Sequence, residues 1–145
     1  MKKILYFDKP VLAKGRNVIG IDIGKNKHSA AAVTVQGELL ATLATFTNDR
    51  EGVDRLENLV LKTAGEPKDI LFALEATGHY WMALYHELTR RGYHGVVLNP
   101  IQTNGEARTR IRKTKTDKRD AEGIARFILT GKAHAARIPD ENTQE

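Results

Sequence analysis

The sequence predicts an α/β fold in which a mixed sheet of five strands is flanked by helices. Short apolar runs rich in Val, Ile and Leu come first as a group of three and later alternate with helix-like segments. Glycine and proline mark most boundaries between these segments, as expected for turns and helix ends. A chain of 145 residues, 41% of them hydrophobic, is long enough for one domain with its own core.

Three strands open the predicted domain. The run Val-Ile-Gly-Ile-Asp-Ile has the pattern of a buried strand. Gln36-Gly37 predicts a hairpin turn between the second and third strands. The expected strands are 18–23, 29–35, 38–46, 70–74 and 95–98.

Helices are predicted after the third strand and after each later strand. Asn48 or Asp49 is a suitable cap for the first helix, and Gly65 with Pro67 ends it. The resulting order, β-β-β-α-β-α-β-α, matches the RNase H-like fold. The expected helices are 48–64, 79–91, a segment beginning at 99, and 117–130.

Composition excludes several classes of function. The sequence has no cysteine, so disulfides, zinc-thiolate sites and thiol catalysis are excluded. No run approaches the roughly 20 apolar residues of a membrane span, so we expect no membrane partner and a cytoplasmic, nucleoid-associated location. The net charge of +5 favours a polyanionic partner.

Four acidic residues carry most of the functional information. Asp22 interrupts an apolar strand and Glu75 ends another, where a buried carboxylate is costly unless a cation or hydrogen bonds compensate. Asp117 and Asp120 are three residues apart, so a helix beginning at Asp117 presents both on one face. Each also has an ordinary alternative. Asp22 and Glu75 could reach solvent at strand ends, and Asp117 could cap a helix with Asp120 in its first turn.

Together the four carboxylates predict a metal site. Oxygen ligands from three separate elements suit Mg²⁺ or Mn²⁺, which require neither Cys nor His. Two such ions about 4 Å apart activate a nucleophilic oxygen and stabilise the leaving oxygen in phosphodiester chemistry. We therefore expect two ions, held by Asp22, Glu75, Asp117 and Asp120.

A basic segment leads directly into the last two acids. Between positions 108 and 119 there are seven cationic residues and a single acid. A solvated surface loop is the ordinary alternative, but this density exceeds what solubility requires, so contact with nucleic-acid phosphates is favoured. The cationic residues are Arg108, Arg110, Arg112, Lys113, Lys115, Lys118 and Arg119.

Four stretches of the sequence resemble the N-terminal domain of the DEDD-type insertion-sequence transposases, the IS-one-ten family with the Piv/MooV invertases. The stretches are IGIDIGKNKHSAAAV, LEATGHY, the NP of VVLNP and KTKTDKRDAEGIA. Their order and spacing make the combination specific. The resemblance carries the family's acidic tetrad onto Asp22, Glu75, Asp117 and Asp120.

The resemblance implies a RuvC-like catalytic domain that binds Mg²⁺ and acts on DNA, in a recombinase guided by a bridge RNA and assembled as a homo-oligomer. Family members continue into a helical domain whose serine attacks DNA, whereas the one serine here, Ser29, lies in a predicted strand. We expect a leader or extra strand at 1–17, the catalytic domain at 18–132, and a linker toward an absent C-terminal domain at 133–145. This part alone is not expected to recombine DNA.

Other functions fit parts of the sequence. A self-contained RuvC- or YqgF-like Holliday junction resolvase or nuclease would use the same carboxylates, although the NP and TDKRDA motifs argue against it. Sugar kinases and actin-like ATPases have a similar IGIDIG pattern but need two such domains and a glycine-rich adenosine motif. A catalytically silent nucleic-acid-binding module is the remaining alternative.

Overall fold

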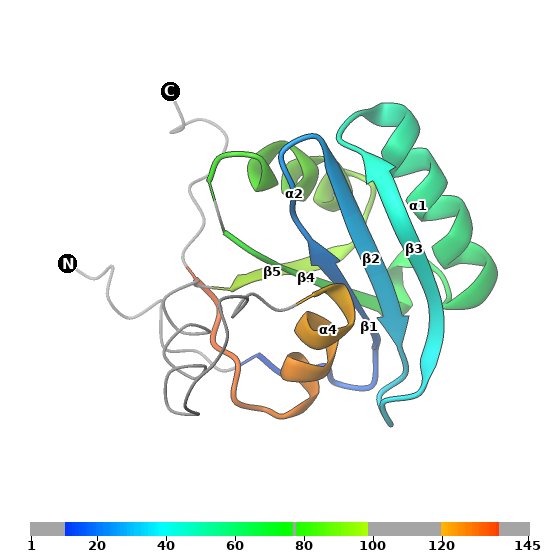
Figure 1. Ribbon diagram of the computed structural model, residues 1–145. Helices are drawn as coiled ribbons and strands as arrows, with labels where there is room; N and C mark the ends of the chain where they lie inside the picture. Colours follow the sequence, from blue (N-terminus) through cyan, green and yellow to red (C-terminus); the bar gives the residue numbers. More distant parts are fainter. Residues whose placement is uncertain (1–10, 77, 99–119, 137–145) are drawn as a thin grey trace.

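The structure of the chain is a computed structural model that describes residues 11–76, 78–98 and 120–136 (Figure 1). These residues form a mixed sheet with helices on both faces. The strands are β1 (Asn17–Asp22), β2 (Lys27–Val33), β3 (Leu39–Thr47), β4 (Ile70–Glu75) and β5 (His94–Leu98). The helices are α1 (Arg50–Thr63), α2 (Trp81–Arg90) and α4 (Ala121–Leu129), with a short 3-10 helix η2 (Pro67–Asp69) before β4.

The five strands form one sheet in the order β3-β2-β1-β4-β5. β1, β2 and β3 are antiparallel neighbours, while β4 runs parallel to β1 and β5 runs parallel to β4. Antiparallel neighbours need only tight turns, whereas the crossovers that lead to β4 and β5 contain α1 and α2. The topology confirms the predicted RNase H-like fold, with a mixed five-stranded sheet flanked by helices.

Helices α1 and α2 cover one face of the sheet. Asp49 caps α1, because its carboxylate accepts a hydrogen bond from the backbone amide of Gly52 at 2.8 Å. The buried side chains of both helices join those of the sheet in one apolar cluster. They are Val53, Leu56 and Val60 of α1, and Trp81, Leu84 and Leu88 of α2.

An ionic cluster joins α1 to the end of α2. The guanidinium of Arg91 contacts the carboxylates of Asp54 at 2.9 Å, Glu57 at 2.8 Å and Glu87 at 2.7 Å. The hydroxyl of Tyr93 donates a hydrogen bond to Glu57 at 2.9 Å. The hydrogen bond from Arg91 lowers the pKa of Glu87, and burial raises the pKa of the Tyr93 hydroxyl. These contacts fix the two helices relative to each other on their face of the sheet.

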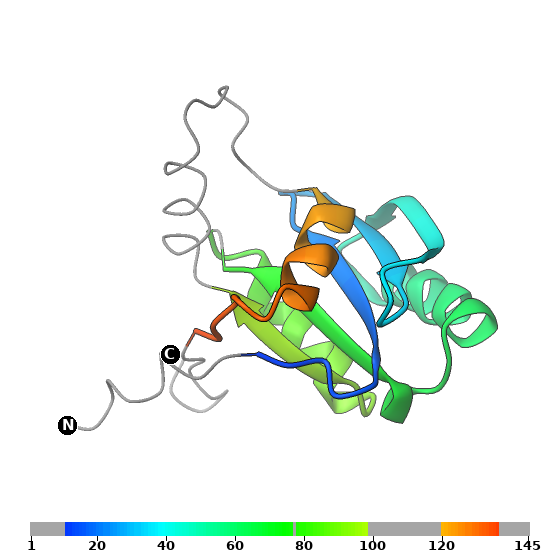
Figure 2. The same cartoon turned by 90° about the horizontal axis from the view of Figure 1, so that it is seen from below.

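Helix α4 covers the opposite face, as the view in Figure 2 shows. It packs directly against β1 at Gly20. A Cβ atom at Gly20 would overlap the carbonyl oxygen of Ala121 and would lie 2.6 Å from the backbone nitrogen of Ala125. The two backbones approach this closely because Gly20 has no side chain.

The element boundaries lie close to the predicted ones, except at the start of α4. Of the expected leader, residues 11–16 are described and contain no strand, and Val11 donates a backbone hydrogen bond to Ala133 at 2.9 Å. The helix expected from residue 99 lies outside the described residues, and the domain boundaries at 17 and 132 stay predictions. In the described parts of the chain, no helix is long and apolar enough to cross a membrane.

Replacing Gly20 with alanine should destabilise the protein by about 1–3 kcal/mol, the usual cost of overpacking a core. The added methyl group meets helix backbone, which cannot rotate away. The free energy of unfolding is measured by urea denaturation. Ala44→Val, at an exposed position of β3, is the control and should change it by less than about 0.5 kcal/mol. Equal stability of Gly20→Ala and wild type would contradict the close contact.

Candidate functional site

Asp22 is the last residue of β1 and lies opposite Ser29 of β2 in the antiparallel pairing. Side chains alternate between the two faces along a strand. Val18 belongs to the apolar cluster beneath α4, and Gly20 touches α4 itself. Asp22 therefore belongs to the face of the sheet that α4 covers.

Glu75 ends β4 and is buried, with 7% of its surface exposed. Ala73, two residues earlier, belongs to the cluster beneath α4, so alternation places Glu75 on the α4 face as well. The parallel register pairs Ile21 with Leu74. Asp22 and Glu75 directly follow this pair, so they lie at the same level on adjacent strands.

Asp120 is the cap of α4, on the same face of the sheet. Its backbone is extended, and its carboxylate accepts a hydrogen bond from the amide of Gly123 at 2.7 Å. The carbonyl of the next residue, Ala121, lies against Gly20, which is two residues before Asp22 in β1. The start of α4 therefore brings Asp120 to the part of the sheet where Asp22 lies.

The prediction that this helix begins at Asp117 is wrong, because α4 begins at Ala121. A cap residue has non-helical backbone angles, and Asp120 has them, so the spacing between Asp117 and Asp120 does not place both on one helix face. Asp117 lies outside the described residues, as do all the predicted nucleic-acid contacts, whose role stays a prediction. These are Arg108, Arg110, Arg112, Lys113, Lys115, Lys118 and Arg119.

The three described acids supply the kind of donor that a hard divalent cation prefers. All of them are carboxylates, and carboxylate oxygens suit Mg²⁺ and Mn²⁺. Within the described residues, no three His, Cys, Asp or Glu side chains are close enough to hold a metal ion together. The chemistry of the donors fits the predicted ions, and convergence of all four acids on one site stays a prediction.

His28 fixes the turn that follows Asp22. Its Nδ1 accepts a hydrogen bond from the backbone amide of Gly24 at 3.2 Å, and its ring packs edge-on against Phe46 with centroids 5.3 Å apart. Burial lowers the pKa of His28, although Asn48 and the charge of Asp22 oppose this effect. Because Nδ1 accepts the bond from Gly24, the neutral ring carries its hydrogen on Nε2. A structural role agrees with the sequence, which gives the histidines no metal-ligand spacing.

A shallow depression of about 170 Å³ opens beside Asp22. Lys27, Ser29 and Thr45 contribute polar side chains to its lining. In the sequence, Lys27 reads as a turn residue and Ser29 as a strand residue. Only the pairing of β1 with β2 makes them neighbours of Asp22, and the short polar turn between the two predicted strands was the signal that could have shown it.

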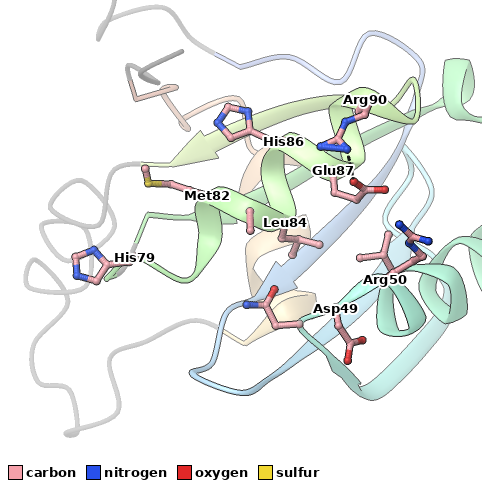
Figure 3. Close-up of a pocket in the computed structure, with 11 residues that line it drawn as sticks. Asp49, Arg50, His79, Met82, Leu84, His86, Glu87 and Arg90 are labelled. Carbon is pink, nitrogen blue, oxygen red and sulfur yellow. Dashed lines mark hydrogen bonds and ion pairs between the residues drawn. The ribbon is translucent and has the colours of Figure 1, made fainter. Parts of the chain in front are cut away.

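A larger cleft, of about 640 Å³, lies between the start of α1 and α2 on the other face of the sheet (Figure 3). Arg50 and Arg90 line it together with Asp49 and Glu87, so its formal charges balance. The carboxylate of Asp49 caps α1, and Glu87 pairs with Arg90 at 2.8 Å. These groups are engaged in holding the helices, so the carboxylates on the α4 face are the better candidate for chemistry.

Comparison with known protein families identifies the domain. The model of the DEDD transposases of the IS110 type, described as "Transposase", matches residues 19–145. The chain belongs to this transposase family. The matched range includes Asp22, Glu75, Asp117 and Asp120, and the predicted family is confirmed.

Two curated relatives of this transposase-family chain are Pilin gene-inverting proteins. The protein from Moraxella lacunata is 31% identical over 112 residues, which cover 77% of this chain and 34% of the relative. The protein from Moraxella bovis is 31% identical over 115 residues, which cover 77% of this chain and 34% of the relative. The chain thus spans about a third of the length of these relatives.

Two solved structures resemble the transposase-family domain at low sequence identity. T. thermophilus RuvC in complex with a Holliday junction substrate has a TM-score of 0.48 at 16% identity, covering 83% of this chain and 99% of that one. The large terminase nuclease from thermophilic phage G20c has a TM-score of 0.46 at 16% identity, and the match covers 86% of this chain and 60% of that one. Strand order and register define the fold of the chain independently of these two structures.

Asp120→Ala should lower the free energy of unfolding by about 1 kcal/mol, because it removes the hydrogen bond that caps α4. Asp120→Asn keeps an acceptor oxygen and should cost only a few tenths of a kcal/mol. Urea denaturation of both variants measures the difference. Equal losses for the alanine and asparagine variants would show that the charge, and not the cap, is what α4 requires.

Proposed function

We propose that this transposase-family domain holds divalent cations through Asp22, Glu75, Asp117 and Asp120 and cleaves phosphodiester bonds in DNA. The observation that supports the proposal is the common level and common face of Asp22 and Glu75 on two parallel strands. The cap of α4 adds a third carboxylate on that face. Family membership supports the same conclusion independently.

Two bound Mg²⁺ or Mn²⁺ ions would activate a nucleophilic oxygen and stabilise a leaving oxygen. The chain's own part is to hold the donors still. Asp22 and Glu75 lie on hydrogen-bonded neighbouring strands, so the register of the sheet fixes their spacing. Asp120 is fixed by its bond to Gly123, and a carboxylate that caps through one oxygen has a second oxygen to offer.

The proposed substrate is DNA, bound in part by the basic segment 108–119. The family resemblance further supports a guide RNA, a homo-oligomer in the full-length protein, and a serine nucleophile supplied by a second domain. It also supports a place of action at the nucleoid in the cytoplasm. The Pilin gene-inverting proteins are named for an inversion, which is a DNA rearrangement and agrees with a recombinase role for the relatives.

Mn²⁺ or Mg²⁺ should raise the melting temperature of the wild-type chain, because a ligand that binds only the folded state stabilises it. At a metal concentration 100 times the Kd, the free energy of unfolding rises by about 2.7 kcal/mol. Asp22→Asn and Glu75→Gln should lose this gain, since each removes a charged ligand with little change in shape. Differential scanning calorimetry with and without metal measures the effect.

Glu51→Gln, at an exposed position of α1, is the matched control and should retain the full metal-induced shift. Asp22→Asn and Glu75→Gln should also slow metal-dependent cleavage of branched DNA by about 100-fold if each costs about 3 kcal/mol of transition-state stabilisation. Equal metal-induced shifts in wild type, Asp22→Asn and Glu75→Gln would contradict the proposed site.

Replacing Arg110, Arg112 and Lys113 with alanine should flatten the salt dependence of duplex DNA binding by about 0.9 in slope for each lost phosphate contact. Fluorescence anisotropy over a series of KCl concentrations measures the slope of log K against log salt. The control carries three alanines in place of the exposed Lys62, Lys68 and Lys132, which removes the same charge. Equal slopes for both triple variants would mean that the basic segment is only a solvated part of the surface.

A further inference from the structure

The turn between β1 and β2 places cationic side chains beside Asp22. It covers residues 23–26 and leads into Lys27, the first residue of β2. Lys25, Asn26 and Lys27 are all exposed. Because β2 is antiparallel to β1, Lys27 lies at the end of the sheet where β1 ends, and so near Asp22.

The turn is held in one conformation by its buried side. The amide of Gly24 donates to Nδ1 of His28, which is 2% exposed and packs against Phe46. A Cβ atom at Gly24 would overlap the backbone carbonyl oxygen of Lys27, so the two ends of the turn are in close contact. A side chain presented by such a turn binds a ligand without the further entropic cost of ordering its backbone.

The depression that Lys27 lines has the size and chemistry for one phosphate group. Its volume of about 170 Å³ equals that of about five or six water molecules in the liquid. Lys27, Ser29 and Thr45 line it, together with the acidic Asp22. Lysine, serine and threonine are among the side chains that commonly contact nucleic-acid phosphates.

We propose that Lys27, with the hydroxyls of Ser29 and Thr45, binds a backbone phosphate of the DNA strand next to the phosphodiester that reacts. This inference rests on the proposed function, because it places the strand beside Asp22. The positive charge of Lys27 offsets the repulsion between Asp22 and the phosphate, which the hydroxyls alone would not do. The contact uses residues other than those of the basic segment 108–119 and gives Ser29 a binding role in place of a nucleophilic one.

The test compares the salt dependence of DNA binding in the wild-type chain and in Lys27→Ala. Binding of a fluorescein-labelled DNA duplex is followed by fluorescence anisotropy between 50 and 200 mM KCl, with EDTA present so that no cleavage occurs. Loss of one phosphate contact should lower the slope by about 0.9, so the ratio of the Kd values at the two salt concentrations should fall about 3.5-fold. Lys27→Arg keeps the charge and should keep the slope.

Lys62→Ala is the matched control, because Lys62 is exposed in the last turn of α1 and does not line the depression. It should bind like the wild type. Equal slopes for Lys27→Ala, Lys62→Ala and wild type would overturn the inference and leave the proposed function intact. A wild-type chain that shows no salt-dependent DNA binding would instead contradict the proposed function. An effect of Lys27→Ala on an RNA duplex of the same sequence, with none on DNA, would also overturn the inference.

Discussion

The packing of α4 against β1 at Gly20 is the contact on which the arrangement of the site depends. The backbones of Ala121 and Ala125 occupy the space that a side chain at residue 20 would fill. This contact sets how far α4 lies from the sheet, and so where its cap, Asp120, is held relative to Asp22. A larger residue at position 20 would move the helix and its carboxylate together, because the helix moves as a rigid body. The glycine is therefore a requirement of both the fold and the site.

The register of the sheet is the second constraint, and it acts on both sides of β1. The parallel pairing with β4 brings Glu75 level with Asp22, and the antiparallel pairing with β2 brings Ser29 opposite it. A shift of one residue in either pairing would turn the partner side chain to the other face. Continuous apolar cores on both faces of the sheet prevent such a shift, since each would then lose buried contacts. Core packing thus secures the positions of polar residues at the strand ends.

The sequence predicted the strands and the first two helices well because these elements have strong local patterns. β4 is buried along its whole length and reads as an apolar run, and the buried stripe of α2 follows helical spacing. The start of α4 was placed too early because Asp117 and Asp120 are equally good caps, and only tertiary packing distinguishes them. The contact between Gly20 and α4, and the grouping of Lys27 and Ser29 around Asp22, depend on register and packing, which no local pattern contains.

Electrostatic repulsion between neighbouring carboxylates on the α4 face is the physical reason for proposing a cation there. Adjacent strands are about 4.8 Å apart, so two ionised carboxylates held side by side at this spacing would repel each other by about 3 kcal/mol at an effective dielectric constant of 20. The positive end of the α4 dipole stabilises a nearby carboxylate by about 0.3–1 kcal/mol, which is too little to offset this repulsion. Hydrogen-bond donors, protons or cations must offset the remaining repulsion. A divalent ion contacts several carboxylates at once and so relieves such repulsion more completely than any single donor, which is the physical reason for the metal binding proposed at Asp22 and Glu75.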